Sequence, residues 1–322
     1  MKKNLFLFKY DIIINIEIRS YKMKKSRYQI KNIERIIVAA ICIIGILFGS
    51  FFDLKIAEKI YNPYSGFGAF FETYGESIAY ARIPLGGVLI FKGTFKNQKR
   101  WMKFLGIGIF VLSLLVCIYF LADSFTYEHN DYGMRLETIP AFIIASIITL
   151  AFTAIFFAII NDSNSTYLVQ IGAIVLISML LQFLIMSFLK VLACRPRYRF
   201  LVDSNLNTDG VVFHSWWQFN FHGFKSLGDS FKSWPSGHSA TASQLLLLPL
   251  IYPVLKWQWK GGRSLLFVLA LVRTLVIAFS RRVYGAHFLS DVSFGVFVGS
   301  LTAFLTNRTM YLIVGRKQRS AE

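Results

Sequence analysis

Charged residues are scarce in this sequence, and acidic residues are scarcer than basic ones. Only 16% of the 322 residues are charged and 55% are apolar, whereas soluble domains usually contain about 25% charged residues. A soluble enzyme of this length would not need so much apolar surface, and a disordered chain would not have it. The three cysteines show no paired spacing, which excludes a disulfide framework and gives no zinc pattern. The composition is therefore typical of an integral membrane protein.

Long apolar segments supply the expected membrane helices, each of which needs about 20 mostly apolar residues. A weaker eighth segment, residues 70–91, contains Glu72, Glu76 and Arg82, which fit either ion-pair packing or a place in a substrate cavity. We therefore predict an all-α, polytopic helical membrane protein with about eight transmembrane helices. The seven clear segments are residues 36–52, 101–122, 140–160, 167–189, 240–255, 264–279 and 287–306.

The basic residues indicate how these helices are oriented. Lys and Arg number 35 against 17 Asp and Glu. Most of them fall in residues 1–35, 92–103, 256–263 and 308–319. If residues 70–91 cross the membrane, all four segments lie on one side, which the positive-inside rule assigns to the cytoplasm. Because topology explains most of the positive charge, nucleic-acid binding is not expected.

One loop breaks this charge pattern. Residues 190–235 lie on the predicted outer side and yet carry six basic residues. Basic residues placed against the topology rule need another explanation, and anion binding is the simplest one. Lys190, Arg197 and, from a later segment, Arg281 are cations that can surround a phosphate, because a guanidinium group offers two parallel donors to its oxygens.

Two further clusters at the predicted outer face contain the reactive residue types. In the second cluster, Ser236 can cap a helix and Gly237 lets backbone N–H groups approach an anion. In the third, His287 and Asp291 are one helical turn apart, so the carboxylate can accept an imidazole N–H and fix the tautomer. His238 is a second histidine that could protonate a leaving oxygen. A nucleophile, an acid and a cationic cradle describe phosphoryl transfer without a required metal.

These clusters resemble the signature of the type 2 phosphatidic acid phosphatase family (PAP2) of membrane lipid phosphatases. That signature is Lys-x6-Arg-Pro, then Pro-Ser-Gly-His, then Ser-Arg-x5-His-x3-Asp. The second motif matches fully at residues 235–238, and the third matches fully at residues 280–291. The resemblance covers about residues 166–306 and implies a catalytic helical bundle.

The first motif departs from the signature. It matches at Lys190 and Arg197, but Tyr198 stands where the proline is expected. The pair Arg195 and Pro196 is a rival match two residues earlier. Spacing favours Arg197, and Arg195 is kept as a possible helper.

The resemblance implies a role for each matching residue. His287 would be the nucleophile that forms a phospho-histidine, Asp291 its orienting partner, and His238 the general acid. No metal and no other cofactor is implied. The phosphate cradle would consist of Lys190, Arg197, Ser236, Gly237 and Arg281.

The chain is accordingly divided into four parts. We expect residues 1–35 to form a basic cytoplasmic segment and residues 36–165 to form the N-terminal transmembrane helices. Residues 166–306 would be the PAP2-like catalytic core, and residues 307–322 a basic cytoplasmic tail. The oligomeric state stays open.

The expected function is hydrolysis of a lipid phosphate or pyrophosphate at the outer face of a bacterial cell membrane. Undecaprenyl pyrophosphate is the favoured substrate, because an outward-facing site suits the carrier released there during cell-wall synthesis. Phosphatidylglycerol phosphate and phosphatidic acid are alternatives within this class. A protein of another class, a non-hydrolytic phospholipid-binding transporter or a phosphate-group transferase, would keep the same cradle. Loss of either histidine would have favoured an inactive protein, and both are present.

Overall fold

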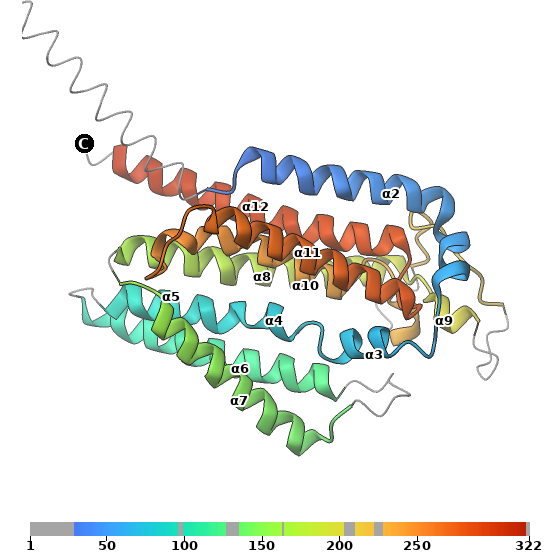
Figure 1. Cartoon of the computed structure of the whole chain (residues 1–322), viewed down its shortest axis with the longest axis horizontal. Helices are drawn as coiled ribbons and strands as arrows, with labels where there is room; N and C mark the ends of the chain where they lie inside the picture. Colours follow the sequence, from blue (N-terminus) through green and yellow to red (C-terminus); the bar gives the residue numbers. More distant parts are fainter. Residues whose placement is uncertain are drawn as a thin grey trace, which may run out of the picture.

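The computed structural model describes residues 29–95, 99–126, 135–162, 164–202, 210–221 and 228–319. Within these ranges the chain is helical and contains no strand, as the composition predicted. Six helices are long and apolar enough to cross a membrane (Figure 1). They are α2 (Asn32–Ile60), α6 (Arg100–Phe125), α7 (Thr138–Ile159), α8 (Ser165–Ala193), α11 (Gly262–Val283) and α12 (Leu289–Arg319).

The two remaining expected spans are built from short helices. The weaker segment consists of α3 (Gly66–Thr73), α4 (Ser77–Tyr80) and α5 (Arg82–Phe95). The segment expected at residues 240–255 consists of α10 (Gly237–Ser243) and the 3-10 helices η2 (Gln244–Leu250) and η3 (Tyr252–Val254). Pro249 lies inside η2, where its missing N–H and its ring disfavour a regular α-helix. Both segments are largely buried among the long helices.

Contacts between distant segments define the two ends of the bundle. At one end, Arg263 at the start of α11 pairs with Glu34 at the start of α2. At the other end, Asn62 N donates to Val283 O at 2.9 Å, just after α2 and at the end of α11. We call this second end the site end, because the loops after α8 and α11 and the start of α10 lie there (Figure 1).

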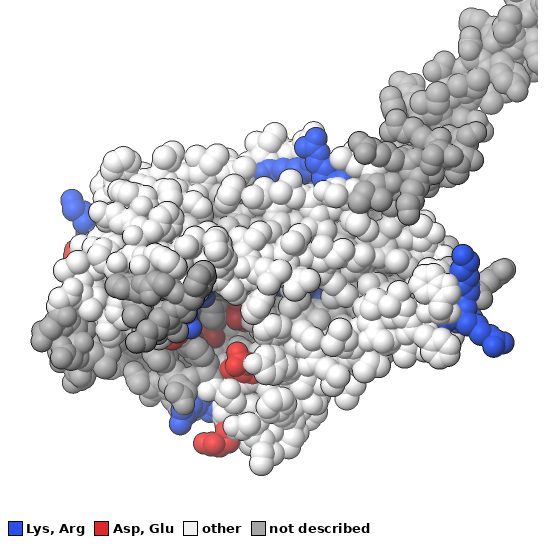
Figure 2. Space-filling view, turned by 180° about the vertical axis from the view of Figure 1, so that it is seen from behind, with Lys and Arg blue, Asp and Glu red and all other residues white. Residues whose placement is uncertain are grey.

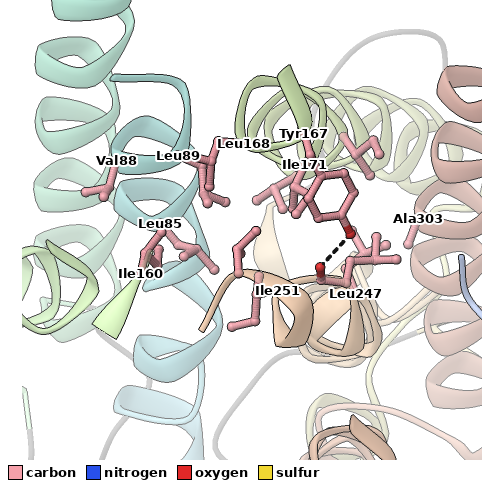
Figure 3. Packing of buried hydrophobic residues seen from close by; sticks show 14 of the residues in the cluster. Leu85, Val88, Leu89, Ile160, Tyr167, Leu168, Ile171, Leu247, Ile251 and Ala303 are labelled. Carbon is pink, nitrogen blue, oxygen red and sulfur yellow. Dashed lines mark hydrogen bonds between the residues drawn. The ribbon is translucent and has the colours of Figure 1, made fainter. Parts of the chain in front are cut away.

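The core lies between α5, α8 and the η2 segment. Tyr167 of α8 buries its ring there and donates its hydroxyl to the carbonyl oxygen of Leu250 at 2.7 Å (Figure 3). Within a membrane, such packing stabilises the bundle through close van der Waals contacts between helices rather than through removal of apolar surface from water. Side chains of the cluster include Leu85, Val88, Leu89, Leu168, Ile171 and Leu247 (Figure 3).

The outward faces of the long helices are apolar instead. Isoleucine, leucine and phenylalanine side chains are exposed along α2, α6, α7 and α8, and most of one whole face of the molecule carries neither acid nor base (Figure 2). Apolar surface on this scale indicates contact with lipid. Together with the six long apolar helices, it makes the chain a multi-pass membrane protein.

Candidate active site

The three motif clusters meet at the site end of the bundle. The first occupies the last turn of α8 and the loop to α9 (Tyr198–Leu201), the second the start of α10, and the third the end of α11 and start of α12. Backbone hydrogen bonds join them. Ser233 N donates to Arg195 O, and Ser236 N donates to Asp291 O, each at 3.0 Å. Residues separated by a hundred positions in sequence therefore share one site.

A cavity of about 260 Å³ opens among these segments. Three of the predicted residues, Ser236, Arg281 and Asp291, are fully buried and do not line it. Part of its wall is apolar and comes from α6 and α8, through Phe120, Met179, Phe183 and Met186. The five predicted residues that line it are Lys190, Arg197, Gly237, His238 and His287.

His287 lies in the connection between α11 and α12 and is 2% exposed. Its Nδ1 atom lies 2.5 Å from the carbonyl oxygen of Ser233. Because a carbonyl oxygen only accepts hydrogen bonds, Nδ1 is assigned the proton and Nε2 keeps its lone pair. A backbone carbonyl thus favours the tautomer whose Nε2 is free.

Asp291 contacts a different partner from the one its spacing suggested. In the described part of the chain its carboxylate makes no hydrogen bond to His287. It accepts from Ser233 Oγ at 2.5 Å and from Phe288 N at 2.8 Å. The reason is that α12 begins only at Leu289, so residues 287 and 291 do not both lie on one helix. Ser233 therefore links the two residues, since its hydroxyl donates to Asp291 and its carbonyl oxygen faces Nδ1 of His287.

Arg281 is suited to bind an anion. Its Nη2 donates to Oε1 of Glu72 at 2.8 Å. Its Nε and Nη1 atoms are buried and have no hydrogen-bond partner among the described residues. Leaving a buried donor unsatisfied costs about 1–3 kcal/mol or more. Two donors of this guanidinium group are thus left without a partner among the described residues.

Lys190 and Arg197 bring further positive charge to the cavity. Arg197 precedes α9 and pairs with Asp229 at 2.7 Å. Lys190 belongs to the last turn of α8. A Cβ atom at Gly237 would lie only 3.3 Å from its Nζ atom, so a larger residue there would crowd the ammonium group.

The second cluster starts α10 as its sequence predicted. Ser236 is the N-cap, and its Oγ accepts from Ser239 N at 3.4 Å and from Ser239 Oγ at 3.1 Å. This cap places His238 in the first turn of α10. Its Nε2 lies 3.1 Å from the carbonyl oxygen of Glu72 and 3.8 Å from Oε2 of Glu76.

Burial and charge set the protonation of the two histidines. Burial, and then the cations Arg197, Arg281 and Lys190, lower the pKa of His287 well below its usual range. Burial also lowers the pKa of His238 to about 4, although the nearby Glu76 carboxylate opposes this. Both imidazoles are therefore neutral near pH 7, and a phosphate beside them would raise their pKa values.

Arg195 and Tyr198, the two residues at which the first motif departs from the signature, both lie outside the cavity lining. Arg195 is 2% exposed and does not line the cavity, because it pairs with Asp53 of α2 at 3.0 Å and also with Asp291. Tyr198 is the first residue of α9, and its ring packs against Tyr61 with centroids 5.2 Å apart. Proline is favoured at that helix position in general. The departure from the signature thus alters packing beside the cavity and not its lining.

Two carboxylates reach the site from outside the motifs. Glu72 belongs to α3, and Glu76 lies just before α4. Glu72 is paired with both Arg281 and Arg199, at 2.8 and 3.0 Å. Sequence reasoning left open whether these acids pack as ion pairs or line a cavity. Glu72 forms ion pairs and also lines the cavity. The sequence signal for such a role was an acidic residue within an otherwise apolar segment.

Fold and site together define a multi-pass helical membrane protein with a cavity at one end of its bundle that is lined by two histidines and by cationic side chains. Residues 171–314 match the model of the PAP2 superfamily. The match supports a phosphatase that acts on lipid phosphates. No curated protein and no solved structure matches the chain.

Proposed function

We propose that this protein hydrolyses a phosphate or pyrophosphate ester of a membrane lipid through a phospho-histidine on His287. The observation that carries the proposal is the shared cavity, which brings both histidines together with Lys190 and Arg197. The unpaired donors of Arg281 beside it add a binding position for phosphate oxygens. The match of residues 171–314 to the model of the PAP2 superfamily supports the same chemistry.

In the first step, Nε2 of His287 attacks phosphorus. The new P–N bond forms as the P–O bond to the leaving group breaks, and the ring becomes cationic. Ser233 O holds the Nδ1 proton throughout. Lys190, Arg197 and Arg281 stabilise the negative charge that gathers on the phosphoryl oxygens, which is where fixed cations accelerate such a reaction.

His238 exchanges the proton. Its Nε2 is assigned a hydrogen because it faces the carbonyl oxygen of Glu72, so Nδ1 is the atom that gives a proton to the leaving oxygen. In the second step, the neutral Nδ1 takes a proton from water while the water oxygen attacks phosphorus. The P–N bond breaks, and phosphate and the starting enzyme are restored.

The lipid would lie with its headgroup in the cavity and its chain against the apolar wall from α6 and α8. We propose undecaprenyl pyrophosphate as substrate, at the outer face of a bacterial cell membrane. Placing the site end outside follows from the positive-inside rule applied to the basic segments of the sequence. Phosphatidylglycerol phosphate and phosphatidic acid are the other candidates. We further propose that residues 166–306 form the catalytic core and that residues 36–165 pack on it.

The test is phosphate release from undecaprenyl pyrophosphate by detergent-purified protein in excess EDTA, with His287→Ala as the control. We expect release that the variant lacks. If no release occurs, phosphatidylglycerol phosphate and phosphatidic acid are tested next. Failure on all three lipids contradicts the proposed hydrolysis and favours a cradle that binds without turnover. Transfer of the phosphate group to a sugar or lipid hydroxyl is detected by product analysis.

A further inference from the structure

The proposed general acid has a carboxylate beside it that the PAP2 motifs do not supply. Oε2 of Glu76 lies 3.8 Å from Nε2 of His238. Glu76 is outside residues 171–314, in the turn between α3 and α4. Its side chain is 11% exposed, and it accepts a hydrogen bond from Tyr80 OH at 2.8 Å. A buried carboxylate held next to an imidazole favours the protonated ring.

The geometry assigns the two ring nitrogens of His238 to different tasks. Nε2 faces two acceptors, the carbonyl oxygen of Glu72 and the carboxylate of Glu76. The carbonyl oxygen of Glu72, at hydrogen-bond distance, holds a hydrogen on Nε2, whereas Glu76 acts through its charge. Nδ1 is then the atom that exchanges a proton with a ligand in the cavity. We propose, on the basis of the phosphatase function above, that Glu76 is a positioning residue that keeps His238 competent as the general acid.

The charges around His238 explain why the carboxylate of Glu76 is needed to favour a protonated ring. The cations close to His238 and the second histidine each disfavour a cationic ring. Of the other carboxylates that line the cavity, Asp229 is paired with Arg197 and Asp123 is exposed. Burial acts in the same direction. Glu72 is already paired with Arg281 and Arg199. The titratable and charged groups facing the pair are Glu72 of α3, Tyr80 of α4, Arg82 of α5, Asp123 of α6, Lys190 of α8, Arg197, Asp229, Arg273 and Arg281 of α11 and His287.

The protons and charges of this step then balance. Protonated His238 carries hydrogen on both nitrogens, with the positive charge balanced by Glu76. As the P–O bond breaks, the Nδ1 proton moves to the leaving oxygen and the ring becomes neutral with its hydrogen on Nε2. Glu76 remains ionised throughout and is neither acid nor base itself. Removing its charge should therefore impair proton donation and leave nucleophilic attack by His287 intact.

A leaving-group comparison tests this assignment. The variant Glu76→Gln keeps the shape and a hydrogen-bond acceptor but loses the charge. We expect its kcat/KM on an alkyl lipid phosphate to fall at least about tenfold, because general acid catalysis typically contributes 10²–10⁴-fold. On p-nitrophenyl phosphate, whose leaving group departs without protonation, kcat/KM should fall less than twofold. Glu58→Gln, the same change on the exposed end of α2, is the matched control.

The two alternatives give other patterns. An equal loss on both substrates means that Glu76 only supports the fold, and no loss on either means that His238 does not need it. Each result overturns the proposal. Glu76→Asp restores the charge and should recover most of the activity on the lipid.

A second measurement does not depend on turnover. The chain has five histidines, so the ¹⁵N signals of His238 can be assigned in detergent by comparison with His238→Gln. We expect the pKa of His238, with inorganic phosphate present, to be lower by about one or more in Glu76→Gln than in the natural protein. An unchanged midpoint contradicts the inference even if every lipid substrate fails. A lowered midpoint in a protein that hydrolyses no lipid would contradict the proposed function alone.

Discussion

Arg195 joins two buried carboxylates, and its removal gives the sharpest prediction about stability. Its Nη2 donates to Asp53 at 3.0 Å, and its Nη1 pairs with Asp291. All three side chains are at most 3% exposed. In Arg195→Met, two buried anions would face each other without their shared cation. Removing one partner from a buried ion pair usually costs about 3–5 kcal/mol.

Thermal unfolding of the detergent-solubilised protein, followed by the fluorescence of its six tryptophans, measures this cost. We expect the midpoint to fall by at least about 5 °C, since about 1 kcal/mol corresponds to a few degrees in a chain of this size. Lys55→Met, which removes an exposed cation of α2, should change stability by less than about 0.5 kcal/mol. The double variant Asp53→Asn with Arg195→Met should recover part of the loss.

Equal stability of Arg195→Met and the Lys55→Met control would refute the reasoning. It would mean that Asp53 and Asp291 are solvated or protonated, and that α2 is not joined to the site through this cation. If the variant is destabilised as expected, its activity below the unfolding transition should also fall, because Asp291 holds Ser233 and Ser233 holds the ring of His287.

Three further variants or conditions give distinct outcomes. Tyr198→Pro should leave kcat/KM within about twofold but lower stability by on the order of 3 kcal/mol, because the ring packs outside the cavity. Gly295→Ala should lower activity at least tenfold, since its Cβ would lie 2.3 Å from the carbonyl oxygen of Ser236, whereas Gly108→Ala, with open space around it, should be nearly neutral. The lowered pKa of His287 means that the nucleophile is already deprotonated below pH 6.5, so kcat/KM should follow a bell-shaped curve with its maximum on the acidic side of neutrality. A rate that climbs without falling from pH 5 to 9 would contradict these histidine roles.

Hydropathy predicted the fold well where a helix faces lipid. The apolar runs that became α2, α6 and α7 have exposed isoleucine and phenylalanine side chains, so their composition directly reflects their surroundings. The segment 70–91 is different because most of α5 is buried in protein. There, packing against neighbouring helices replaces contact with lipid, so short helices and charged residues are tolerated.

The site was predictable only as far as its local motifs. Cap and spacing arguments placed Ser236 and the two histidines, because those features depend on neighbouring residues. The partner of His287 was not predictable, since it is a backbone carbonyl 54 positions away that tertiary folding brings near. Glu76 likewise reaches His238 across 162 positions. Single-sequence spacing cannot reveal such contacts.

The central claim is that His287 becomes covalently phosphorylated during turnover. Protein mixed with the lipid substrate and quenched in alkali, where phospho-histidine survives, can be digested and analysed by mass spectrometry for a phosphate on the peptide that contains His287. We expect a transient phosphate on His287 that is absent in His287→Ala and that persists longer in His238→Gln, which lacks the base for the second step. Phosphate release by a protein whose His287 never carries phosphate would contradict it.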